Sequence, residues 1–154
     1  MLTAAVCFDG VDDEALVEAA LDLLRCFERV ESWCAYGDEA QRLLDDAGER
    51  HHGPPHHRPH PHHYETADAE QAEAIAAHGV TLLQRAGFTA VARTYRGIDA
   101  GHALARASNA EHALILAAGH RESTGPKSVG HVARFVVDHA RGPVIVVRPG
   151  GNSG

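Results

Sequence analysis

The chain is poor in several residue types that mark whole classes of protein. Only 5% of its 154 residues are aromatic, and its 21 acidic residues outnumber its 14 lysines and arginines, giving a net charge of −7 with histidine neutral. Proteins that bind nucleic acids usually present a basic stripe with interleaved aromatic side chains, and this chain has neither. Its apolar runs are all far shorter than the ~18 residues of a membrane span. We therefore expect no nucleic acid partner and no membrane attachment.

Cysteine is also scarce, and its three positions form no recognisable pattern. Cys7, Cys26 and Cys34 are odd in number and include no C-x-x-C pair. Structural disulfides are typical of oxidising compartments, so we interpret these thiols as small buried hydrophobic residues of a reducing one. The opening MLTAAVCFDG also lacks the basic segment of a secretory signal. Together these features predict a cytoplasmic protein.

Short apolar runs alternate with segments of helical periodicity along the chain. The runs lack polar alternation, as strands buried on both faces do, and they cover residues 2–8, 30–36, 88–95, 113–118 and 144–147. Between them, apolar residues recur every three or four positions, as on one helix face, at residues 16–27, 66–86 and 99–108 and from Gly130 onward. A further short helix is expected at residues 38–49.

This alternation predicts a single α/β domain. Strands that alternate with helices usually pair in parallel, so we expect a five-stranded, mostly parallel, doubly wound sheet with helices on both faces. The domain is expected to cover residues 1–149, and residues 150–154 to form a flexible tail.

Two helix starts carry N-terminal signals. Asp12, Asp13 and Glu14 lie where the positive end of a helix dipole favours negative charge, and helix capping alone explains this acidic run. Thr66 is the expected N-cap of the next long helix, and Gly87 the expected residue after its end.

Residues 51–64 differ in composition from the rest of the chain. They hold seven of the thirteen histidines and four of the seven prolines, which exclude a regular helix or a central strand, so we expect a His- and Pro-rich surface loop. Imidazole binds Zn²⁺, Ni²⁺ and Cu²⁺, and the candidate ligands are His51, His52, His56, His57, His60, His62 and His63. No fixed ligand spacing accompanies them, and such runs are common as solvated loops, so a physiological divalent metal is not expected.

The most specific stretch of the chain runs from His112 to Arg148. An apolar run ends near Gly119, a loop rich in Gly, Ser, Thr and Lys follows, Gly130 opens a helix, and a second apolar run follows Gly142. In open α/β sheets, the N–H groups of such a loop and the N-terminus of the next helix converge on phosphates. The loop between the two strands is therefore a candidate phosphate site.

Three parts of the chain resemble the universal stress proteins. The start, AAVCFDGVDDEALVEAALDLL, is similar to their V-D-G-S…A-L…A opening, and residues 96–119 fit their G-x-x-x-x-x-I…A…L-I-V-x-G pattern with Leu104 at the Ile position. The end resembles their closing segment, G-S-V-x-x-x-V-x-x-H-A-x-x-P-V-x-V-V, at Gly130, Val132, Val136, His139, Ala140, Pro143, Val144, Val146 and Val147. The resemblance implies an adenine nucleotide alpha hydrolase-like fold, a regulatory or binding role in the stress response, and a homodimer formed through Val144–Val147.

The phosphate loop matches the family pattern in part. Nucleotide-binding members carry G-x-x-G, nine residues and G-[ST]. Here Gly119 and Gly130 match the first and last glycines, Glu122 replaces the second glycine with only seven residues between it and Gly130, and His131 replaces Ser/Thr. A carboxylate at this point repels phosphate, whereas Arg121, Lys127 and His131 offer positive charge in compensation. The resemblance thus implies ATP or another adenine nucleotide bound by Phe8, Asp9, Gly119, Arg121, Lys127, Gly130, His131 and Val132.

Three functions therefore stay open at this point. The chain is a stress-response protein that binds an adenine nucleotide, or a family member that acts through protein partners or metal binding by its histidines, or a weak ATP hydrolase. It shows no Ser/His/Asp set, no carboxylate pair and no metal-ligand motif, so no catalytic residue is assigned and a non-enzymatic role is favoured.

Overall fold

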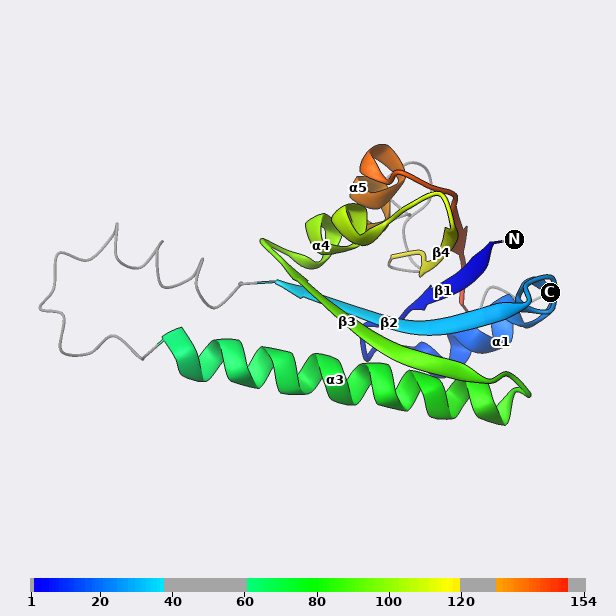
Figure 1. The fold of residues 1–154 in the computed structure, drawn as a ribbon, viewed down its shortest axis with the longest axis horizontal. Coiled ribbons are helices and arrows are strands. Elements are labelled where there is room, and N and C mark those ends of the chain that lie inside the picture. Colours follow the sequence, from blue (N-terminus) through cyan, green and yellow to red (C-terminus); the bar gives the residue numbers. More distant parts are fainter. Residues whose placement is uncertain (1, 38–60, 120–129, 150–154) are drawn as a thin grey trace, which may run out of the picture.

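The computed structural model describes residues 2–37, 61–119 and 130–149, without the side chains of residues 61–67. Strands and helices alternate strictly along this part of the chain (Figure 1). The elements are β1 (Thr3–Cys7), α1 (Asp13–Leu24), β2 (Arg29–Gly37), α3 (Pro61–Arg85), β3 (Ala90–Gly97), α4 (Ala100–Ala107), β4 (His112–Ala117), α5 (His131–His139) and β5 (Val144–Val147).

The five strands form one sheet in the order β3-β2-β1-β4-β5, and each neighbouring pair is parallel. The predicted five-stranded α/β sheet is thus confirmed, and it is parallel throughout rather than mostly so. The chain builds the sheet outward from β1 to β3 and then returns to the other side of β1 with β4. The strand order reverses at the junction of β1 and β4, which is where open sheets of this kind form a ligand crevice.

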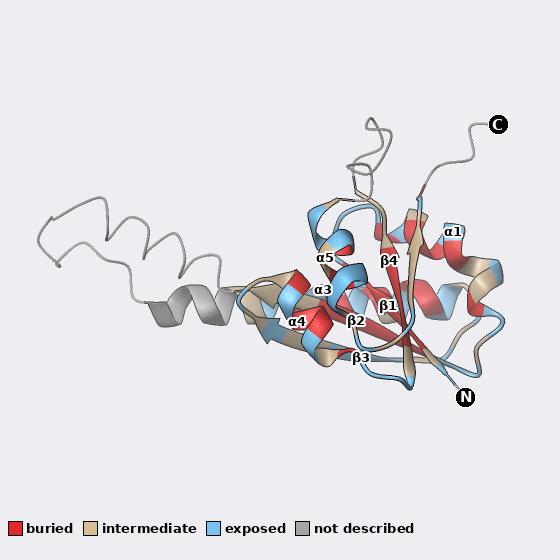
Figure 2. Ribbon diagram, turned by 90° about the horizontal axis from the view of Figure 1, so that it is seen from above, coloured by how far each residue is buried: buried red, intermediate tan, exposed pale blue. Residues whose placement is uncertain are grey.

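Helices cover both faces of the sheet. Figure 1 shows α4 and α5 on one side of the strands and α3 on the other, and α1 packs in the same layer as α3. Along β1, Val6 contributes to the core beneath α1 and α3, whereas Ala5 and Cys7 contribute to the core beneath α4 and α5. Figure 2 shows β1 and β4 buried along their length, which explains their apolar runs without polar alternation.

The start of α3 differs from the prediction. The helix begins at Pro61, so residues 61–64 of the predicted loop are helical and Thr66 lies inside the helix instead of capping it. Proline is tolerated in the first helical turn because its missing N–H would have no intrahelical partner there. The exclusion of proline from helices therefore does not apply to Pro61. Residues 51–60 and the short helix expected at 38–49 lie outside the described residues.

A glycine allows α3 to lie directly on the sheet. A Cβ built on Gly79 would collide with Ser32 Oγ on β2 and with the Phe8 ring. Ser32 is fully buried, and its hydroxyl donates a 2.7 Å hydrogen bond to the carbonyl of Ala76 on α3. The close contact and the buried hydrogen bond together fix the middle of α3 against β2 and against the Phe8 ring that follows β1.

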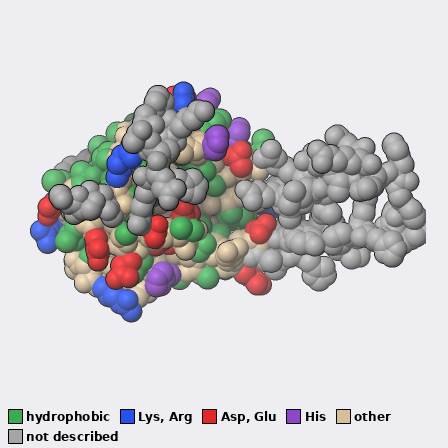
Figure 3. Space-filling view, turned by 180° about the vertical axis from the view of Figure 1, so that it is seen from behind, with side chains coloured by type: hydrophobic (Ala, Val, Ile, Leu, Met, Phe, Trp, Pro, Cys, Tyr) green, Lys and Arg blue, Asp and Glu red, His purple; other side chains and the backbone are tan. Residues whose placement is uncertain are grey.

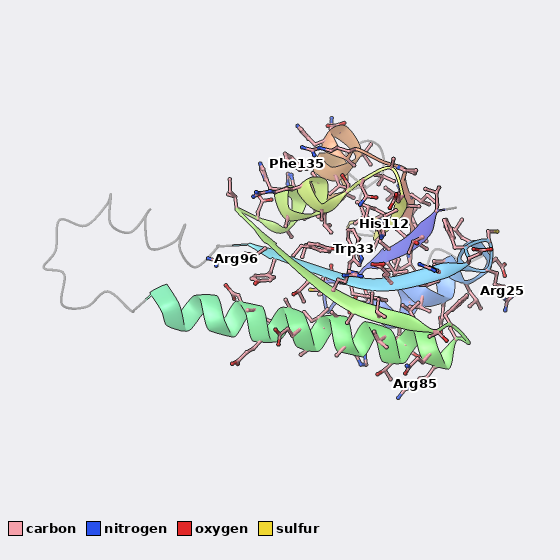
Figure 4. All side chains as sticks on the ribbon, in the orientation of Figure 1. Arg25, Trp33, Arg85, Arg96, His112 and Phe135 are labelled. Carbon is pink, nitrogen blue, oxygen red and sulfur yellow. The ribbon has the colours of Figure 1, made fainter. Side chains whose placement is uncertain are left out.

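Glu31 on β2 is the centre of a buried polar network on the opposite face. Its carboxylate accepts hydrogen bonds from Trp33 Nε1 at 3.0 Å and from Arg93 Nε at 2.8 Å, and it lies 3.3 Å from His112 Nε2. Burial alone would raise the pKa of Glu31, but bonds from Trp33, His112 and Arg93 hold that pKa below its ordinary value. Figure 4 shows Trp33 and His112 on the same side of the strands, with ring centroids 5.2 Å apart.

The cysteines are free thiols. Cys7 and Cys34 are buried as expected, whereas Cys26 is exposed just after α1 because it lies beyond the helix face that packs on the sheet. None of the helices in the described part of the chain is long and apolar enough to cross a membrane.

Candidate functional site

The crevice at the strand-order reversal collects several of the residues predicted to bind a ligand. Asp9 follows the carboxyl end of β1, and Gly119 follows the carboxyl end of β4. The two strands are direct neighbours in the sheet, with Cys7 level with Leu116. The strand ends therefore present both segments at one edge, as parallel pairing requires.

Gly119 and Gly130 meet at this edge of the sheet. Gly130 is the N-cap residue of α5 and has a φ of +87°, a conformation that side chains with a Cβ rarely adopt. A Cβ at this position would lie 3.0 Å from Gly119 Cα and 3.3 Å from Gly119 N. The N-terminus of α5 thus sits against the end of β4, and the absence of a Cβ at Gly130 permits that approach.

The other residues predicted to bind the ligand differ in where they lie and in how exposed they are. His131 and Val132 lie in the first turn of α5, and both are exposed. Arg121 and Lys127 lie outside the described residues. The Phe8 side chain is only 3% exposed and packs in the core beneath α1 and α3, so this side chain points away from the crevice edge, and ligand binding by Phe8 stays a prediction. A residue that follows a buried strand can still point into the core, which the motif alone does not reveal.

Asp9 and Asp13 arrange the loop between β1 and α1. Asp9 Oδ1 accepts a hydrogen bond from the Val11 N–H at 2.8 Å. The two oxygens of Asp13 accept hydrogen bonds from the Asp9 N–H at 3.3 Å and from the Gly10 N–H at 3.0 Å. Three successive N–H groups of this loop are therefore already bonded within the loop.

Asp13 is the residue of this site that sequence reasoning missed. The acidic run was assigned to helix capping, but the Asp13 bonds reach back into the loop, and Asp12, the N-cap residue, makes no capping hydrogen bond with its side chain. The signal that could have found it is an aspartate three residues after a glycine turn, a spacing that allows a carboxylate to bind the turn's amides.

The environment of Asp13 disfavours its charged form. Only 7% of the residue is exposed, and this burial raises the pKa of its carboxyl to about 6. Hydrogen bonds from the Asp9 and Gly10 amides act against the rise, and the nearby charge of Asp9 adds to it. A strongly shifted carboxyl beside a crevice marks a candidate functional residue.

An open groove of about 730 Å³ lies next to this loop, between α1 and α3. None of the predicted ligand residues that the structure places lines it, although Gly10 and Asp13 border both the groove and the loop. Figure 3 shows acidic side chains between apolar ones on the face of the molecule opposite the view of Figure 1. The lining residues are Gly10, Asp12, Asp13, Glu14, Ala15, Glu18, Gln71, Ala74, Ile75 and His78.

The placed residues contain no group of three or more His, Cys, Asp or Glu side chains that could hold a metal ion. This finding covers the crevice loop after β1 and the groove. The histidines at positions 51, 52, 56, 57 and 60 fall outside the described residues, and for His62 and His63 only the helical backbone is described. Metal binding by these histidines therefore stays an alternative that the described residues do not test.

Comparison with known proteins places the chain among relatives of one kind. Residues 38–148 match the model of the universal stress protein family. A search of curated proteins gave no match.

Solved structures of similar fold cover almost the whole chain. The universal stress protein UspA from Lactobacillus plantarum superposes with a TM-score of 0.62 at 18% identity, covering 96% of this chain and 97% of its own. A universal stress protein from Archaeoglobus fulgidus gives 0.55 at 16% identity, with 96% and 99% covered. The Archaeoglobus fulgidus protein in complex with dAMP gives 0.50 at 13% identity, with 96% and 98% covered. At these identities the likeness establishes the shared fold.

Proposed function

This chain belongs to the universal stress protein family, and from that premise we propose that it is a stress-response binding protein that holds an adenine nucleotide between the ends of β1 and β4. The observation that carries the proposal is the approach of Gly130 to Gly119 at the N-terminus of α5. Without Cβ atoms, both backbones are open to a ligand, and a helix N-terminus favours the negative charge of a phosphate.

The hydrogen bonds of the loop between β1 and α1 favour one direction for the proposed ligand. On the β1 side, the N–H groups of Asp9, Gly10 and Val11 already donate to the carboxylates of Asp13 and Asp9, so these three amides are not free to bind phosphate, and the first turn of α1 beside them carries the acidic residues Asp13 and Glu14. The phosphate end therefore lies toward Gly119 and Gly130, and the nucleoside end lies toward Asp9. The dAMP held by the Archaeoglobus fulgidus protein makes a purine nucleotide the natural first probe.

Thermal unfolding in the presence of Mg²⁺-ATP, ADP, AMP and dAMP tests the proposal. A binder is stabilised by about 2.7 kcal/mol at a hundredfold excess of ligand over its dissociation constant. Gly130→Ala should abolish this stabilisation, because its Cβ intrudes on Gly119. Gly87→Ala is the matched control, since Gly87 also has a positive φ, of +98°, but nothing lies within 4 Å of its Cβ position. The absence of any shift at millimolar nucleotide would refute the proposal.

We also propose that two copies pair through β5. This strand is at one end of the strand order, and all four of its residues are half-buried in the isolated chain. An edge strand of Val and Ile with unpaired backbone groups is a template for another strand, and pairing with a second copy would satisfy those groups.

A further inference from the structure

The buried carboxylate of Asp13 stabilises the loop between β1 and α1 by hydrogen bonds to its backbone. Its carboxylate is the acceptor for two adjacent amides, those of Asp9 and Gly10, at 3.3 and 3.0 Å. The loop passes through two left-handed conformations, with a φ of +86° at Gly10 and +55° at Asp12. A non-glycine residue persists in that region only where its surroundings impose it. The Asp13 carboxylate is the group that ties both sides of this turn together.

The loop is also where the nucleoside end of the proposed ligand lies. Asp9 belongs to it, and the Asp9 carboxylate is fixed toward the Val11 amide at 2.8 Å. A change at Asp13 therefore moves Asp9 and Gly10 directly, because their amides are its hydrogen-bond donors. Gly10 has little freedom of its own on the other side, since its Cβ position is 3.1 Å from Ile75 Cδ1.

Asp13 is surrounded mainly by acidic groups. Asp9 and Asp12 face it from the loop, Glu14 and Glu18 line the same groove from α1, Cys34 lies near it on β2, and His78 lines the groove from α3. The groove gives solvent a path to the carboxylate. Burial, first of all, raises the pKa of Asp13 to about 6, so the carboxylate that holds the loop at neutral pH becomes a neutral acid in mildly acidic solution.

We propose that Asp13 is a positioning residue that makes nucleotide binding depend on pH. When ionised, Asp13 accepts both amides and keeps Asp9 and Gly10 in the shape that receives the nucleoside. When it takes up a proton from solvent, one oxygen becomes a hydroxyl donor, one amide is released, and the loop loses that shape. The inference rests on the proposed nucleotide site and adds to it a control by acidification.

The test compares AMP affinity in the wild-type protein and in Asp13→Asn at pH 7.5 and pH 5. Wild type should bind AMP about tenfold more tightly than Asp13→Asn at pH 7.5, within the usual range of coupling between linked groups, and equally at pH 5. Protonation of AMP itself changes the affinity of all variants equally. The ratio of the wild-type affinity to the Asp13→Asn affinity therefore reports on Asp13 alone. Asp22→Asn is the control, because Asp22 is on the same helix with a 96% exposed side chain. Among the described residues, His78 is the only histidine that lines the groove. The variant His78→Gln removes this imidazole and so shows whether its titration contributes to the pH dependence.

A ligand-free measurement accompanies the affinities. In the wild-type protein, the backbone amide signals of Asp9 and Gly10 should shift together as pH falls through 6, and these shifts should vanish in Asp13→Asn but persist in Asp22→Asn. A ratio of affinities that stays the same at both pH values, or amides that do not titrate in wild type, overturns the inference. If no nucleotide binds at any pH but the amides titrate, the proposed function fails while control of the loop by Asp13 stands.

Discussion

At the scale of single residues, Asp13 and Glu31 are two buried carboxylates with opposite preferences. Burial dominates at Asp13 and raises its pKa to about 6, whereas three hydrogen-bond partners outweigh burial at Glu31 and lower its pKa. An ionised Asp13 therefore destabilises the folded state, whereas an ionised Glu31 stabilises it. Groups kept at such a cost are typical of functional sites, where stability is traded for activity.

Asp13 predicts a specific dependence of stability on pH. Because its folded-state pKa is about 6 against an ordinary 3.8, its contribution to stability is full below pH 3.8 and is lost as pH rises through 6. The loss amounts to about 3 kcal/mol at most, from about 1.4 kcal/mol per pH unit. Urea unfolding of Asp13→Asn should therefore lack this slope and give at pH 7 at least the wild-type stability. A variant clearly less stable than Asp22→Asn at pH 7 would contradict the assignment.

Glu31 predicts the opposite dependence of stability on pH. Its lowered pKa means that its contribution is present above an ordinary value of 4.5 and is lost as pH falls below it. Glu31→Gln leaves Trp33, Arg93 and His112 without a charged acceptor, and we expect a loss of about 2 kcal/mol at pH 7. Urea unfolding at pH 7 and pH 3 measures both effects. A loss that is as large at pH 3 as at pH 7 would show that packing, and not charge, carries the contribution.

At the scale of elements, α3 depends on the glycine in its middle. Gly79→Ala adds a methyl group against Ser32 and Phe8, and overpacking of this kind costs about 1–3 kcal/mol even though alanine favours helices. Combining it with Ser32→Ala removes the nearest obstructing atom, so the double variant should lose less than the sum of the single variants. Thermal unfolding of the four proteins gives this comparison, and strict additivity would disprove the contact.

The edge strand β5 gives the prediction for assembly. Pro143 and Val147 direct their carbonyls to β4, so by strand alternation the backbone of Val146 points outward. Val146→Pro should remove an outward N–H and convert a dimer into monomers, while Val146→Ala should leave the dimer intact. Sedimentation equilibrium measures both. A wild-type protein that is monomeric at high concentration would contradict pairing through β5.

The elements also show how far the sequence could predict the fold. Buried strands such as β1 and β4 were found correctly, because apolar runs without alternation have few other interpretations in an α/β chain. The start of α3 was not, because proline excludes helix interiors but is accepted in the first turn. Local sequence signals alone do not show at which residue of a proline-rich segment a helix begins.

At the scale of the whole molecule, the sheet topology makes the site. Gly119 and Gly130 were predicted from the loop motif, and the parallel neighbours β1 and β4 bring them to the same edge as Asp9. The spacing after Gly10 could indicate the loop bonds of Asp13, but its raised pKa could not be predicted, because it depends on how deeply the folded chain buries the carboxyl group. Motifs thus located residues that meet at one edge of the sheet, and packing decides which of their side chains are buried there.

The central claim is that an adenine nucleotide binds where the strand order reverses, and mapping AMP binding by backbone amide NMR tests it most directly. We expect AMP to shift the amide signals of Gly119, Gly130 and Gly10 with one dissociation constant, while the signal of Gly87, at the far end of α3, stays unchanged. Signals of Gly119 and Gly130 that stay unchanged at millimolar AMP, or shifts confined to Ala74 and its neighbours in the groove, would contradict the account.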